Sequence, residues 1–149
     1  MIMLTTQAIA NTFILAGAKE DIPLTPMKIQ KLVYILYKHY YKQTKIKLFT
    51  ENFEKWKYGP VLPSLYYEFK SFGAAPVTKF ARNASGAIEI IDLTSNLMIN
   101  KIFEEIWNKY KKFSAIELSS FTHRENTAWS KTDTNVLKDE DIIDEPEYI

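Results

Sequence analysis

Residues 25–42 read TPMKIQKLVYILYKHYYK and carry the strongest structural signal in the chain. Thr25 offers a side-chain oxygen that can cap a helix, and Pro26 presets the backbone of a first helical turn, where no donor is missed. Apolar side chains then recur at i, i+3, i+4, i+7, i+8 and i+11, namely Ile29, Leu32, Val33, Leu36, Tyr37 and Tyr40. This spacing predicts a helix from Pro26 to about Lys42 with one face in the core.

The opposite face of this helix is predicted to be basic. At about 100° per residue its lysines gather on one side, interrupted by Ile35: Lys28, Lys31, Lys38 and Lys42. Such lysines are usually a solvated face, but they also suit contacts to phosphates. Nucleic-acid binding is therefore kept as a weaker alternative function.

Caps and apolar spacing predict further helices on either side of this one. Their expected starts are, in chain order, Thr6, Pro63, Thr94 or Ser95, and Ser114, the last paired with Glu117 in a capping box. The first helix is expected to end near Gly17, and the last to run from Ala115 to about Thr122.

Two segments favour extended structure. Residues 76–93 are predicted to form a β-hairpin, with a turn at Asn83–Gly86 and with Ile88 and Ile90 on one face. Residues 55–58 alternate lysine and aromatic side chains, which is typical of a strand. We therefore predict a mainly α-helical α+β fold, a compact domain of about five or six helices with a small hairpin.

The composition indicates one domain followed by an acidic tail. The chain has 149 residues, 46% of them hydrophobic, which suffices for a single core. Residues 139–149 hold six acidic side chains and no Lys or Arg, so this tail is −6, whereas residues 1–138, with 19 basic and 12 acidic side chains, are +7. We expect a single domain over 1–138, a partly ordered tail over 139–149, and attraction between them.

The sequence has no cysteine and no long apolar run, which indicates the compartment in which we expect the protein. Zero cysteines exclude disulfides and thiolate metal sites and favour a reducing compartment. No stretch approaches the roughly 20 apolar residues of a membrane span, and no signal peptide is recognisable. We expect a cytoplasmic protein that does not contact a membrane.

No arrangement of residues predicts an active site or a cofactor. The two histidines, His39 and His123, belong to no metal-binding motif, and the four glycines are too scattered for a phosphate loop. Ser119 and Ser120 lie close to His123, but no nucleophile elbow surrounds them. The sequence predicts a non-enzyme without metal or cofactor, with a hydrolase around His123 as a weaker alternative.

Aromatic residues are the most distinctive feature of the composition. They make up 14% of the chain and include nine tyrosines, more than a small core readily buries. Tyrosine contributes a large contact area at low entropic cost, so exposed tyrosines suit a protein-binding surface. An equally good interpretation places each tyrosine at the rim of the core with its hydroxyl in water.

Three segments together resemble a known family. They are IANTFI (9–14), LTPMKIQKLVY (24–34) and WKYGPV (56–61) running on to Tyr66, with a weaker match at Thr122, His123, Glu125 and Trp129. In this order and spacing they resemble the SocA-like antitoxins, or Panacea domain family. Asn126–Ala128 departs from the family, which often has a proline before the tryptophan.

The resemblance implies an antitoxin of a bacterial or prophage toxin–antitoxin pair, which binds its toxin directly rather than acting by catalysis. The toxins that accompany this domain type differ in activity, so the resemblance does not identify the partner. One family member instead delivers its toxin to a protease. A proteolytic adaptor, which would also contact a protease or its chaperone, is therefore an alternative.

Within the matched motifs we assign two kinds of role. Structural roles are expected for Thr25, Pro26, Leu32, Trp56, Gly59, Pro60, His123 and Trp129. Contacts to the toxin are expected from Lys28, Lys31, Tyr34, Tyr58, Tyr66 and Tyr67. For the lysines, an ion pair with the acidic tail is a competing use.

Overall fold

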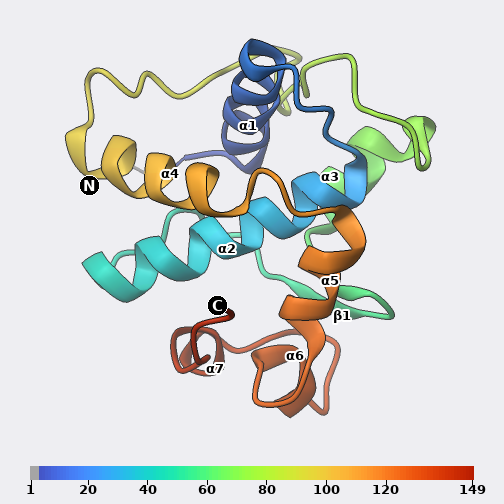
Figure 1. The fold of residues 1–149 in the computed structure, drawn as a ribbon, viewed down its shortest axis with the longest axis vertical. Helices are drawn as coiled ribbons and strands as arrows, with labels where there is room; N and C mark the ends of the chain where they lie inside the picture. The colour runs from blue at the N-terminus through green and yellow to red at the C-terminus, as the bar shows by residue number, and fades with distance from the viewer. Residues whose placement is uncertain (1–3) are drawn as a thin grey trace.

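The central helix, α2 (Pro26–Thr44), is enclosed by other elements on several sides (Figure 1). The structure is a computed structural model and describes residues 4–149. Within that range the other elements are α1 (Thr6–Glu20), β1 (Glu54–Trp56), β2 (Gly59–Val61), α3 (Pro63–Phe69), the 3-10 turn η1 (Lys70–Phe72), α4 (Leu97–Tyr110), α5 (Ala115–His123), α6 (Ala128–Lys131) and α7 (Asp139–Ile143). The expected α+β, mainly helical fold is confirmed.

The start of α2 forms as its sequence predicts. The Thr25 side chain accepts a hydrogen bond from the Lys28 amide at 3.3 Å, and Pro26 occupies the first turn. The helix continues two residues beyond the expected end and stops at Lys45, whose backbone is left-handed with φ of 62°. Prediction and structure therefore agree on this element.

Two predicted caps are wrong by one or two residues. Helix α1 is capped by Thr5, which accepts from the Ala8 amide, and it passes through Gly17 to end at Asp21. Helix α4 is capped by Asn96, whose side-chain oxygen accepts from the Ile99 amide, while Thr94 donates to Asp92 through its amide and its hydroxyl. The capping box that begins α5 is confirmed.

The hairpin lies in a different segment from the one predicted. Strands β1 and β2 pair antiparallel, with Glu54 opposite Val61 and Trp56 opposite Gly59, so that Lys57 and Tyr58 form the turn. Residues 76–93 contain no strand. The hairpin predicted there is wrong, although its turn exists, since the Asn83 amide donates to the carbonyl of Ala87.

Side chains of α1 take the place of a strand partner for residues 76–93. The Asn11 amide group donates to the carbonyls of Ala81 and Glu89, both at 2.9 Å, and its oxygen accepts from the Ala81 amide at 2.7 Å. Thr12 accepts from the amide of Ile91. Because α1 bonds these backbone groups directly, the segment needs no β-ladder.

Helices α1 and α4 pack against one side of α2, and α5 and α7 pack against others. The core contains many aromatic contacts, such as Phe13 with Phe103 at 4.7 Å between ring centroids and Tyr34 edge-on to Phe53 at 4.9 Å. Over residues 4–149, none of the helices is both long and apolar enough to cross a bilayer.

Residues 132–149 lie against the body of the protein. The amide of Leu137 donates to the Phe53 carbonyl, and the amide of Lys55 donates to the Asn135 carbonyl. Beyond these bonds, Ile142 and Tyr148 are buried. The tail is therefore packed in this structure, while the division of the chain at residue 138 stays a prediction.

Candidate functional site

A groove of about 420 Å³ lies between the start of α2, the hairpin and α3. We call it the hairpin groove; its walls include Met27, Lys31, Trp56, Tyr58, Leu65 and Tyr66. Leu65 and Lys31 are buried and form its floor, whereas Tyr58 and Tyr66 are exposed and form its rim. The groove therefore combines an aromatic rim with a largely apolar interior.

Three of the four tyrosines predicted to contact a partner lie at or beside this groove: Tyr58 and Tyr66 line it, and Tyr67 adjoins Tyr66. Trp56 and Tyr66 are in contact at 4.8 Å between ring centroids, and Tyr67 is edge-on to Tyr66 at 5.3 Å. Tyr58 is 54% exposed and Tyr67 is 66% exposed. We call these four residues the aromatic surface; it contains several of the exposed large hydrophobic side chains of the described chain.

Gly59 and Pro60 hold the hairpin against the helices. Gly59 has φ of +119°, which disfavours any side chain, and a Cβ there would lie 2.9 Å from the hydroxyl of Thr122. The Pro60 carbonyl accepts a hydrogen bond from the Lys31 ammonium at 2.8 Å. The bend therefore brings the hairpin into close contact with α2 and α5.

Trp129 and Gln30 support the hairpin from two further directions. The Trp129 indole donates to the Trp56 carbonyl at 2.6 Å, and the Gln30 side chain bonds both the amide and the carbonyl of Leu62 at 2.9 Å. The aromatic surface is thus carried on a well-supported part of the fold. The backbone on either side of the hairpin turn is therefore held by hydrogen bonds rather than forming a free loop.

Three of the residues expected to contact the toxin are buried, namely Lys28, Lys31 and Tyr34. The expectation that the lysines of α2 form a solvated basic face is wrong. Lys31 is 1% exposed and Tyr34 is fully buried, while the Lys28 ammonium donates to the Lys111 carbonyl at 2.5 Å. Lys38 is also fully buried, so α2 has no solvated basic stripe. The reason is that α5 and the tail cover the face of α2 that a single helix would leave in water.

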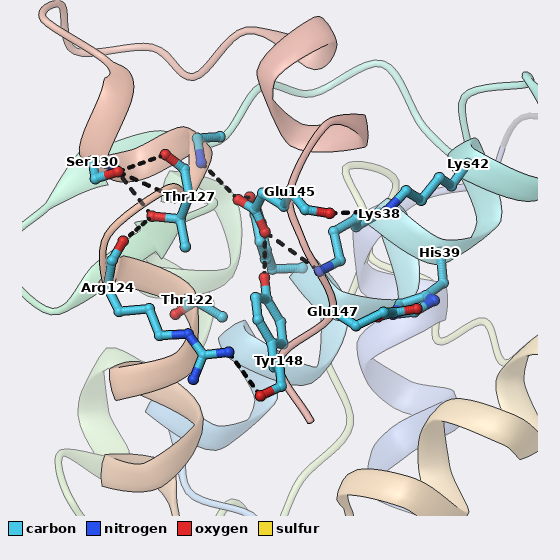
Figure 2. A network of polar contacts seen from close by, with 12 residues as sticks. Lys38, His39, Lys42, Thr122, Arg124, Thr127, Ser130, Glu145, Glu147 and Tyr148 are labelled. Atoms are coloured by element: carbon cyan, nitrogen blue, oxygen red, sulfur yellow. Dashed lines mark hydrogen bonds and ion pairs between the residues drawn. The ribbon is translucent and has the colours of Figure 1, made fainter.

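A buried network links the tail to α2 (Figure 2). The Glu145 carboxylate accepts hydrogen bonds from Tyr34, from Tyr148 at 2.5 Å and from the Ala128 amide at 2.8 Å. It also pairs with Lys38 at 3.4 Å, and its backbone carbonyl accepts from Lys42. The expected attraction between body and tail thus occurs as specific bonds, made by Lys38 and Lys42. The competing ion pair of Lys28 or Lys31 with the tail is not formed among residues 4–149.

Burial changes the acidity of the groups in this network. Desolvation lowers the pKa of Lys38 to about 8, although the Glu145 charge opposes the shift. Burial has the opposite effect on the two tyrosines, because a tyrosine is charged only when deprotonated. It raises the pKa values of Tyr34 and Tyr148 well above the usual range, and the nearby Glu145 carboxylate raises them further. Both tyrosines are therefore neutral donors to Glu145.

The surroundings of His123 do not match a serine hydrolase. The Ser119 hydroxyl donates to the Tyr58 carbonyl, and the His123 Nδ1 lies 2.5 Å from the Ser119 carbonyl, so this nitrogen carries the proton. Nδ1 cannot then accept the proton of the Ser119 hydroxyl, whose oxygen lies 3.5 Å away. His123 instead packs against the Trp129 ring, at 5.2 Å between centroids.

No group of three or more possible metal ligands occurs among residues 4–149. The features that sequence reasoning missed are the groove itself and the role of Glu145. Met27 and Lys57 join the groove from different elements, so no local spacing signals it. For Glu145 the only signal was the acidic composition of the tail.

The domain is mainly helical around a buried central helix, and it carries a supported hairpin beside the groove. Residues 29–130 match the family described as antitoxin SocA-like, Panacea domain, and the chain belongs to this family. A similar protein is Antitoxin SocA of Caulobacter vibrioides (strain NA1000 / CB15N), which is 27% identical over 126 residues, 83% of this chain and 67% of the relative. No solved structure matches the chain.

Proposed function

We propose that this protein neutralises a toxin by direct contact through the aromatic surface. The observation that carries the proposal is the exposure of Tyr58 and Tyr67 beside the groove of a member of an antitoxin family. The similar protein named Antitoxin SocA supports the same general role.

The physical basis is the area that these side chains would remove from water. Large aromatic side chains dominate binding energy at interfaces, and a few of them usually carry most of it. Tyr58 and Tyr67 lie beside lysines, Lys57 at 5.3 Å and Lys70 at 6.0 Å from the ring centroids. A partner that covers the rings would also meet this positive charge, which speeds encounter with acidic surfaces.

The test is co-expression with the product of the reading frame next to this gene. We expect the wild-type chain to relieve growth arrest by that product and to copurify with it. Tyr58→Ala and Tyr67→Ala together should abolish both effects. Because both side chains are largely exposed, the thermal melt of this variant should stay close to that of the wild type.

Leu97→Ala is the matched control, because Leu97 is 78% exposed at the start of α4, far from the hairpin in Figure 1. It should bind and neutralise as the wild type does. Normal binding by the double tyrosine variant would refute the proposed surface. Toxin that disappears only when a cellular protease is present would instead favour a proteolytic adaptor.

A further inference from the structure

We propose that the hairpin groove binds an acidic side chain of the toxin, with its carboxylate beside Lys31 and the adjoining apolar part of the partner against Trp56 and Tyr66. This inference rests on the proposed function and adds the chemistry of the recognised segment.

Two buried lysines of α2 have different partners in the fold. Lys38 and Lys31 are 0% and 1% exposed, respectively. Lys38 has a carboxylate partner, because the tail brings Glu145 to 3.4 Å. Among residues 4–149, Lys31 has no carboxylate within 4.0 Å, and its ammonium donates to one acceptor, the Pro60 carbonyl.

A buried ammonium with one acceptor is incompletely satisfied. It has three donors, and removing its charge from water without a counter-charge is costly. Desolvation lowers the pKa of Lys31 to about 7, which agrees with this picture. A carboxylate placed nearby would supply to Lys31 what Glu145 supplies to Lys38.

The groove is suited to deliver that carboxylate. Among the described residues that line it, Lys31 and Lys57 are basic and none is acidic. The remaining walls are largely apolar, with Met27 and Leu65 below the aromatic rim. The lining therefore favours a segment in which an aliphatic or aromatic side chain accompanies Asp or Glu.

Lys31→Met tests the inference, because methionine keeps an unbranched apolar side chain and removes the charge. Binding of the toxin that passes the co-expression test is measured by titration calorimetry. We expect Lys31→Met to weaken it by about tenfold or more and Lys57→Met, at the rim, to weaken it less. Lys101→Met, at an exposed site on α4, is the control and should leave affinity unchanged.

A second measurement leaves this chain intact. Each surface Asp or Glu of the toxin is changed in turn to Asn or Gln. We expect one of these changes to weaken binding to the wild-type chain by about tenfold. The same change should weaken binding to the Lys31→Met variant little further. This pattern identifies the carboxylate even where Lys31→Met lowers the thermal stability.

The outcomes separate the two proposals. If the toxin binds but no acid-to-amide change weakens it, the groove does not recognise a carboxylate, and only this inference is overturned. Equal binding by Lys31→Met and wild type overturns it as well. If no neighbouring product binds at all, the proposed function fails and the inference fails with it.

Discussion

The ammonium of Lys38 lies 3.4 Å from the carboxylate of Glu145, 107 residues later in the chain, and both side chains are fully buried. The Glu145 carboxylate also accepts three other hydrogen bonds, from Tyr34, Tyr148 and the Ala128 amide. A buried ion pair with this many supporting donors is strongly destabilised when one partner is removed, because the other is left uncompensated.

Glu145→Ala should therefore lower the free energy of unfolding by about 3 to 5 kcal/mol, as measured by denaturant titration. Glu140→Ala, at an exposed position of the same acidic tail, should change it by less than about 0.5 kcal/mol. Replacing Lys38 and Glu145 together by methionine should recover part of the loss. Equal effects of the Glu145 and Glu140 changes would contradict the buried pair.

Gly59→Ala should destabilise the fold by about 1 to 3 kcal/mol. The new Cβ would meet the Thr122 hydroxyl at 2.9 Å and would have to adopt φ near +119°. Gly86→Ala is the control, since φ is also positive there but no atom lies within 4 Å of the new Cβ. Thermal melts that show the same loss for both variants would exclude the close approach at Gly59.

Asn11→Ala should cost about 1 to 3 kcal/mol, because it leaves the buried amide of Ala81 without its acceptor. Hydrogen exchange of the Ala81 amide should accelerate more than exchange within α2. The control is Asn108→Ala, at an exposed position on α4. Unchanged exchange at Ala81 would show that Asn11 does not hold this segment.

The stability should rise with pH through the titration of Lys31. Its pKa is about 7 in the fold because of desolvation, against 10.5 when solvated. Below about pH 7 the side chain is charged in both states and its burial cost applies in full; between about pH 7 and pH 10 only the unfolded chain keeps the proton, so the free energy of unfolding rises.

Lys31→Met lacks this titration, so the difference in stability between it and the wild type should change over the same pH range. Lys38 shifts in the same direction but is present in both proteins, and it therefore cancels in the comparison. Parallel pH profiles of the two proteins, measured by urea unfolding, would show that Lys31 is not desolvated.

The elements that the sequence predicts well are those fixed by neighbouring residues. Thr25 and Pro26 begin α2 as expected, and Ser114 with Glu117 begins α5, because caps act over three residues. The alternation of Ile88 and Ile90 predicted a strand, but a strand also needs a partner. Asn11, 78 residues before Glu89, supplies that partner, because its side chain donates to the Glu89 carbonyl.

The candidate site was predictable only in part, for a related reason. Tyr58, Tyr66 and Tyr67 lie near one another in sequence, and all three are exposed, which was one of the two interpretations that the sequence left open. Helical spacing placed Lys31 and Lys38 opposite the apolar face of α2, but it does not tell whether another layer covers that side. Here α5 and the tail do so, which changes solvated charges into buried ones.

The position of Glu145 also bears on how the protein is made. During synthesis the ribosome produces Lys38 long before Glu145, and a domain generally folds as a unit. Until the carboxylate emerges, α2 cannot bury Lys38 without leaving its charge unopposed. A chain broken off before Glu145 is therefore left with a helix that resists enclosure, and cellular proteases would meet it in an open state.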